Sequence, residues 1–144
     1  MDQNCVRTLL MYLVDNLRPT DTGKHPRPIK IRSLSVLPEF SDYDSAELYE
    51  AAQYLHSKGL ITLSTDGLSV SSLAAPNQHF AVPTPSEPAP RRYVVKQVTA
   101  AGLDYCVVLR KETLWSKLLE KFGNSALDQA LSFPVALLLQ LLSN

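Results

Sequence analysis

The stretch Val98–Trp115 reads VTAAGLDYCVVLRKETLW and supports two opposite interpretations. The aromatic and β-branched run YCVVL inside it is typical of a buried strand. Its opening, VTAAG, instead indicates the end of a strand followed by a helix, because the hydroxyl of Thr99 can accept a hydrogen bond from a free amide of a first helical turn. Four residues then fall on one side of such a helix: Leu103, Cys106, Val107 and Arg110. This spacing favours a helix that buries the apolar run.

The segments before this stretch predict a helix and then a short strand. Apolar residues at three- and four-residue spacing make residues 2–17 an amphipathic helix, which ends at Arg18-Pro19 because the residue before proline avoids the helical conformation. In residues 29–36, isoleucines alternate with Lys30 and Arg32. That alternation predicts a half-buried strand.

The best-marked helix begins at Asp44 or Ser45, whose side chains can cap it, and ends at Lys58-Gly59, where glycine suits the left-handed conformation. Its inward-facing residues are Leu48, Ala51, Ala52 and Leu55. A strand follows directly. Residues 75–90 contain five prolines and therefore form a long loop, and residues 91–98 resume as a strand.

Beyond Trp115, the pattern predicts two further helical regions. Apolar residues at helical spacing continue to Phe122, and Gly123-Asn124 ends that helix. Ser125, followed three residues later by Asp128, resembles a capping box that opens the last region. We assign Trp115 to the core, since a tryptophan beside a leucine in an amphipathic helix is more often buried than a ligand platform.

The overall composition bounds the class of protein. A chain of 144 residues with 45% hydrophobic and 19% charged residues fits one globular domain and excludes wholesale disorder. Fourteen basic and fourteen acidic residues balance, whereas a dedicated nucleic-acid binder usually carries a basic excess. We expect Cys5 and Cys106 to be buried thiols in a reducing compartment. Without a signal peptide or a run long enough to span a bilayer, we expect a cytoplasmic protein with no membrane contact.

The sequence carries no motif for catalysis or metal binding. His25, His56 and His79 lack the spacing of zinc ligands, and no cysteine lies near any of them. A glycine-rich phosphate loop, a G-x-S-x-G elbow and a paired-carboxylate motif are also missing from the sequence. We therefore expect no enzymatic activity, no metal and no cofactor.

The order of the predicted elements resembles a winged-helix domain. This resemblance implies an α+β, mainly helical fold: a winged helix–turn–helix with a small antiparallel sheet and additional C-terminal helices. The chain is then a single domain, with a winged-helix core over residues 1–98 and a helical extension over residues 99–144. The proline-rich loop at about residues 75–90 is interpreted as an enlarged wing.

The stretch that starts at Tyr93 is also similar to an uncharacterised family of bacteria and their prophages. That family carries L-T-x-x-G-H-x-F-L after a strand, and then R-x-D-T-x-W-x-K; the similarity covers roughly the last two-thirds of the chain. The matching residues are Val98, Thr99, Gly102, Tyr105, Arg110, Thr113, Trp115 and Lys117. Leu103 replaces the family's histidine, and its acidic pair is reduced to Glu112. The family has no established catalytic residues, so none is carried over.

A winged helix most often binds DNA, with its second helix in the major groove and its wing on the backbone. The resemblance therefore implies a small DNA-associated regulator. Four carboxylates in or just before that helix count against this pose: Asp42, Asp44, Glu47 and Glu50. The alternative is a protein-interaction adaptor that uses the same scaffold without DNA. The candidate nucleic-acid-binding residues are Lys24, Arg27, Lys30, Arg32, Gln53, Lys58, Arg91, Arg92 and Lys96.

The final apolar run, VALLLQLL, has more apolar surface than a helix packed on one side requires. Either neighbouring helices or a second subunit must cover it. We expect a twofold homodimer through this helix. The candidate interface residues are Phe133, Val135, Leu138, Leu139 and Leu142.

Overall fold

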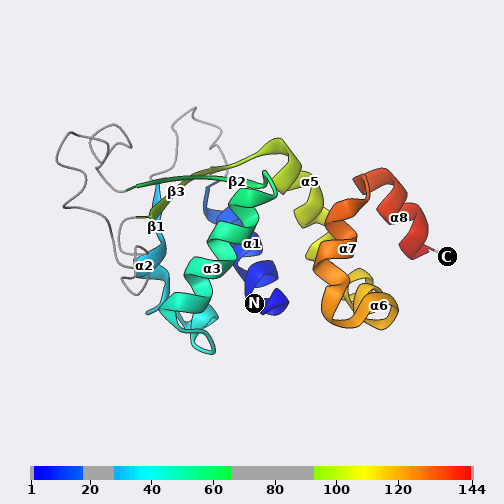
Figure 1. Ribbon diagram of the computed structural model, residues 1–144, viewed down its shortest axis with the longest axis horizontal. Helices are drawn as coiled ribbons and strands as arrows, with labels where there is room; N and C mark the ends of the chain where they lie inside the picture. Colours follow the sequence, from blue (N-terminus) through cyan, green and yellow to red (C-terminus); the bar gives the residue numbers. More distant parts are fainter. Residues whose placement is uncertain (1, 18–27, 66–92, 144) are drawn as a thin grey trace, which may run out of the picture.

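The structure is a computed structural model that describes residues 2–17, 28–65 and 93–143. It is mainly helical, with one small antiparallel sheet (Figure 1). The elements before the sheet's hairpin are α1 (Gln3–Asn16), β1 (Ile29–Lys30), α2 (Ile31–Leu34), the 3-10 turn η1 (Pro38–Phe40) and α3 (Ser45–Ser57). The hairpin strands are β2 (Ile61–Thr65) and β3 (Tyr93–Val98). After β3, the described residues form α5 (Ala100–Leu109), α6 (Glu112–Phe122), η4 (Gly123–Ser125), α7 (Ala126–Ser132) and α8 (Val135–Ser143).

The sheet has the order β1-β3-β2, and both pairings are antiparallel. Val95 at the centre of β3 pairs in register with Ile29 on one side and with Leu63 on the other. Thr62 pairs with Gln97, so Lys96 is an extra residue and forms a β-bulge. α2 and β1 lie at one end of the molecule, and α6, α7 and α8 gather at the other (Figure 1).

The strand predicted over residues 29–36 is wrong beyond Lys30. After two strand residues, the chain turns into the short helix α2, in which Ile31 and Leu34 are both buried. Residues three apart share one face of a helix but lie on opposite faces of a strand, so only the helix buries both. The hydroxyl of Ser33 donates to the carbonyl of Lys30 and supports this turn.

α3 begins and ends where the sequence predicts. Asp44 accepts a hydrogen bond from the Glu47 amide at 2.8 Å, and Glu47 accepts one from the Asp44 amide at 3.2 Å, which forms a capping box. Gly59 takes φ +75° just after the helix, and the Leu60 amide donates back to the carbonyl of Leu55. The four predicted inward residues are all buried: Leu48, Ala51, Ala52 and Leu55.

The stretch after Val98 is a helix, as its spacing predicts. Thr99 caps α5 by accepting from the Gly102 amide at 3.1 Å, and its own hydroxyl donates to the carbonyl of Gly59 at 2.7 Å. The Thr99 amide donates to the carbonyl of Leu60 at 2.9 Å. A β-carbon on Gly102 would lie 2.2 Å from that Leu60 oxygen and 2.6 Å from Cγ1 of Val98. Only glycine allows α5 to approach β2 this closely.

The predicted buried face of α5 is only partly correct. Cys106 is buried, but Val107 is 53% exposed, whereas Val108 and Leu109 are buried. α5 contacts α1, β3, α6 and α8, so it buries residues on more than one side. A single stripe at helical spacing therefore does not describe its core-facing residues.

Side chains of α1 bind the later helices. Trp115 is 3% exposed, as predicted, and its indole N–H donates to Oδ1 of Asn4 at 3.3 Å. The guanidinium of Arg7 lies 5.4 Å from the centre of the Trp115 ring. Arg7 also donates to the carbonyls of Leu109 and Arg110 and to the carboxylate of Glu112, where α5 ends and α6 begins. These contacts join α1 to the α5–α6 turn.

The capping box predicted at Ser125 does not form. The Ser125 hydroxyl donates back to the carbonyl of Phe122 at 2.9 Å and makes no cap hydrogen bond. Gln3 of α1 caps the helix instead, because its Oε1 accepts from the Leu127 amide at 3.1 Å. The Nε2 of Gln3 donates to the carbonyl of Gly123 at 2.9 Å.

One cluster of buried apolar side chains runs from α1 to α8.

We predict that Gly102→Ala destabilises the protein by about 1–3 kcal/mol, because the new methyl group overlaps the Leu60 carbonyl. Helix propensity alone predicts the opposite sign, a gain of about 1 kcal/mol. Urea denaturation followed by the fluorescence of Trp115 measures the difference. The matched control is Ala101→Ser, at the exposed neighbouring position, which should change stability by less than about 0.5 kcal/mol. A stabilised Gly102→Ala variant would contradict the close approach.

Candidate nucleic-acid interface

The solvent-exposed face of α3 carries side chains that are either short or polar. Four exposed residues lie opposite the buried stripe of this helix: Ala46, Glu50, Gln53 and Ser57. Among these, Gln53 carries an amide, which can both donate and accept hydrogen bonds at a base edge. None of the four is a cation, so this face offers little to a phosphate backbone.

The start of α3 is strongly acidic. Asp42 and Asp44 precede the helix, and Glu47 lies in its first turn. Behind them, burial raises the pKa of the Cys5 thiol to about 12, and the negative charges of Asp2 and Glu47 add to this effect. The carboxylates at this end of α3 would repel a phosphate group.

Three candidate basic residues are exposed on the paired strands β1 and β3 and on the helix α2 that follows β1. Lys30 and Arg32 are exposed on β1 and α2, and Lys96 is exposed on β3. Lys30 pairs in register with Val94, which is two residues from Lys96. The remaining basic candidates, Lys24, Arg27, Arg91 and Arg92, lie outside the described residues, as does the predicted proline-rich loop at residues 75–90.

Gln53 and Lys58 do not join this group. Lys58 directly follows α3 and lies three residues before Ile61, the β2 residue that pairs with Val98. β1 pairs with Val94 and Val95, toward the opposite end of β3, so Lys58 and Lys30 lie near different ends of this strand. Its ammonium lies 5.5 Å from the centre of the Tyr54 ring, and the Tyr54 hydroxyl donates to Asp128 of α7. Tyr54 therefore ties α3 to α7.

An aromatic pair links α3 to the hairpin. The rings of Tyr49 on α3 and Tyr93 at the start of β3 meet edge to face, with centres 4.8 Å apart. Tyr93 pairs in register with Thr65, the last residue of β2. Helical spacing alone could not find this contact, because it joins residues from two different elements.

Several of the residues from Thr99 to Lys117 make contacts that hold the elements together. Thr99 and Gly102 attach α5 to the sheet, as described above. The Tyr105 hydroxyl donates to the carbonyl of Phe133 at 2.5 Å, and Arg110 forms an ion pair with Asp15 at 2.6 Å. Lys117 donates to the carbonyl of Leu142 at 2.8 Å. Together with the hydrogen bond from Trp115 to Asn4, these contacts connect elements that are distant in sequence, so these residues have an architectural role in this chain.

The candidate dimer residues divide into two groups. Leu138 and Leu142 are fully buried in the chain's own core, which corrects their assignment to an interface. Leu139 is 39% exposed, and Phe133 and Val135 are partly buried. Leu138 and Leu142 are four residues apart and share one apolar face of α8. A regular apolar face of this kind usually packs against the helix's own protein.

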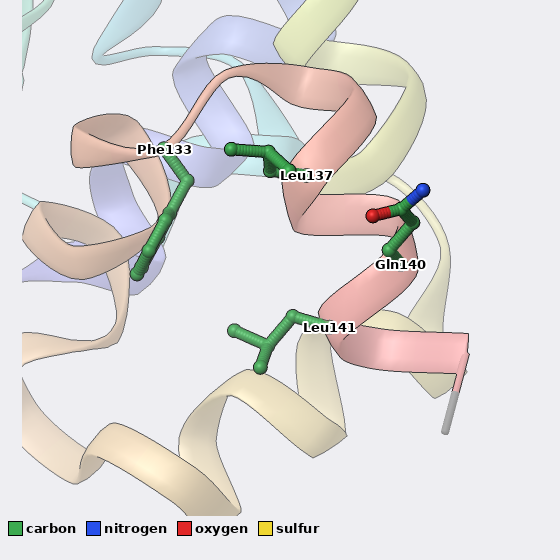
Figure 2. A pocket seen from close by; sticks show the side chains of 4 residues that line it. All are labelled: Phe133, Leu137, Gln140 and Leu141. Carbon is green, nitrogen blue, oxygen red and sulfur yellow. The ribbon is translucent and has the colours of Figure 1, made fainter.

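Beside that face lies a hollow that the sequence pattern missed. Phe133, Leu137, Gln140 and Leu141 line an open depression of about 290 Å³, and Leu137 is 52% exposed (Figure 2). Phe133 approaches it from the turn after α7, and the other three residues approach it from α8 (Figure 2).

Other kinds of site find no support among the described residues. Cys5 and Cys106 are both buried thiols, as predicted. Within residues 2–17, 28–65 and 93–143, no group of three or more histidine, cysteine, aspartate or glutamate side chains could hold a metal ion. In the same ranges, every helix is too short or too polar to cross a membrane.

Comparison with known proteins gave no match: no protein-family model, no curated protein and no solved structure is significantly similar to this chain.

We predict that the protein loses stability as pH rises from about 9 to about 12. The unfolded Cys5 thiol ionises near its ordinary pKa of 9.0, while the pKa of the folded thiol is about 12, so the folded chain holds an extra proton in this range. Comparing urea midpoints of the wild type and Cys5→Ala at neutral pH and within this range tests the cause. The wild type should lose more stability than the variant. Equal losses would contradict it.

Proposed function

We propose that the chain is a winged helix–turn–helix protein that associates with DNA through cations beside its sheet. The supporting observation is the arrangement of elements. A helix, a strand, two helices and a hairpin follow in order, and the last strand, β3, lies between the first strand and the second. α2 contacts α3, and α3 keeps a polar outer face next to the hairpin.

The charges favour contact with the DNA backbone over reading by α3. The acidic start of α3 disfavours its entry into the major groove, because carboxylates there would approach phosphates. Lys30, Arg32 and Lys96 are instead exposed on β1, α2 and β3, and Arg27 and Arg92 directly precede described segments in the sequence. Contacts between such cationic side chains and phosphate groups give DNA binding with little sequence preference and strong salt dependence.

A charge-reversal experiment tests the proposal. We predict that Lys30→Glu combined with Lys96→Glu weakens binding to random duplex DNA at low salt by at least about tenfold, and lowers the slope of log affinity against log salt by about 0.9 for each lost phosphate contact. Fluorescence anisotropy over a salt series measures both quantities.

The matched control is Lys111→Glu combined with Lys121→Glu. Lys111 directly precedes α6 and Lys121 lies in its last turn, away from the sheet, and both are exposed. The double substitution changes the net charge by the same amount. This variant should keep most of the affinity. Loss of equal size in both variants, or no binding by the wild type even at low salt, would contradict the proposal.

A second candidate function is a protein-interaction adaptor. The observation that favours it is the acidic group Asp42, Asp44 and Glu47 at the exposed start of α3, which suits a basic protein surface better than DNA. The same titration separates the two functions, since an adaptor would show no salt-dependent affinity for DNA.

A further inference from the structure

The stretch that contains α8 carries no charged side chain of its own. From Gln129 to Asn144 there is no lysine, arginine, aspartate or glutamate, although 19% of the whole chain is charged. Within this stretch, α8 buries Leu138 and Leu142 in the protein's own core. It still exposes Leu137 and Leu139 on its flanks, at 52% and 39%.

The hollow beside α8 fits a protein side chain better than a small molecule. Its volume of about 290 Å³ is at the lower limit for ligand pockets, and it is open to solvent, whereas a ligand pocket encloses most of its ligand (Figure 2). Phe133, Leu137 and Leu141 supply an apolar lining, and Gln140 supplies the polar side chain. An apolar side chain from a protein surface needs only the lining.

We propose that a second copy of this chain covers the hollow, in a twofold contact centred on Phe133, Leu137 and Leu141. Charge argues for this occupant. A twofold axis brings each residue near its own copy, so any charged residue at its centre would meet a like charge. Phe133, Leu137 and Leu141, at the centre of the contact, lie in a stretch without charged side chains and bring no like charges together. A net charge of zero at pH 7 adds no long-range repulsion between copies.

The contact is expected to be weak. Stable interfaces bury about 800 Å² per partner with about 20–30 residues on each side. α8 has nine residues, and part of it faces inward. The dimer should therefore dissociate in the micromolar range and form only as concentration rises.

Sedimentation equilibrium of the full chain, from low micromolar to submillimolar concentration, tests the proposal. The wild type should shift from monomer to dimer, and Leu137→Glu should stay monomeric throughout because it buries a charge against its own copy. The milder Leu137→Ser should weaken the dimer at least about fivefold. The matched control is Val107→Glu on α5, which introduces the same charge at a side chain that is 53% exposed and should dimerise as the wild type does.

Circular dichroism and the fluorescence of the buried Trp115 verify that each variant is folded. A wild type that stays monomeric at every concentration would overturn the proposal and leave the hollow to a different protein. Equal weakening by Leu137→Glu and Val107→Glu would also overturn it. Neither result bears on DNA association, which the lysine variants test separately at concentrations below dimerisation.

Discussion

The close approach of Gly102 to the carbonyl of Leu60 sets the positions of the elements around it. At this point the backbone of α5 touches the start of β2, in space that a β-carbon would fill. Thr99 fixes the same junction from both sides, since it caps α5 and also bonds to Gly59 and Leu60 at the end of α3. The exit of α3, the start of β2 and the start of α5 are therefore held in one place. The direction of α5, and of every helix after it, follows from this junction.

α1 then joins the two ends of the molecule. Its buried residues pack on α3 and α5, while Gln3 and Arg7 reach forward to α7 and to the α5–α6 turn. Arg7 satisfies backbone carbonyls that the end of α5 would otherwise leave without helical partners. A charge-assisted bond to such carbonyls is stronger than a neutral one, so a truncated side chain here would leave several acceptors unpaired. The C-terminal helices are thus attached to the core by polar contacts as well as by packing.

Sequence patterns predicted the structural features that neighbouring residues determine, and missed the features that depend on residues far apart in the chain. The caps at Asp44 and Thr99 and the glycine at position 59 were predicted correctly, because each works within a few residues of itself. The cap of α7 was not, since Gln3 provides it from 124 residues away. Ile31 was predicted to lie in a strand because isoleucines alternate with Lys30 and Arg32 in this segment. The chain instead begins the helix α2 at Ile31. For the candidate site, the sequence pattern listed Lys58 as an outward residue of the second helix and could not show that its ammonium lies over the Tyr54 ring.

If the Thr99–Gly102 junction holds the two ends of the molecule together, the described residues should unfold as one cooperative unit. Native-state hydrogen exchange measures this directly, because the Thr99 and Gly102 amides are donors at the junction itself. We expect these amides, and the central amides of α5 and α6, to exchange with the same opening free energy as those of Leu9 and Leu10 in α1. If α5–α8 instead exchanged with a clearly lower opening free energy than α1 and α3, the C-terminal helices would be a separate unit, and the junction would not hold the fold together.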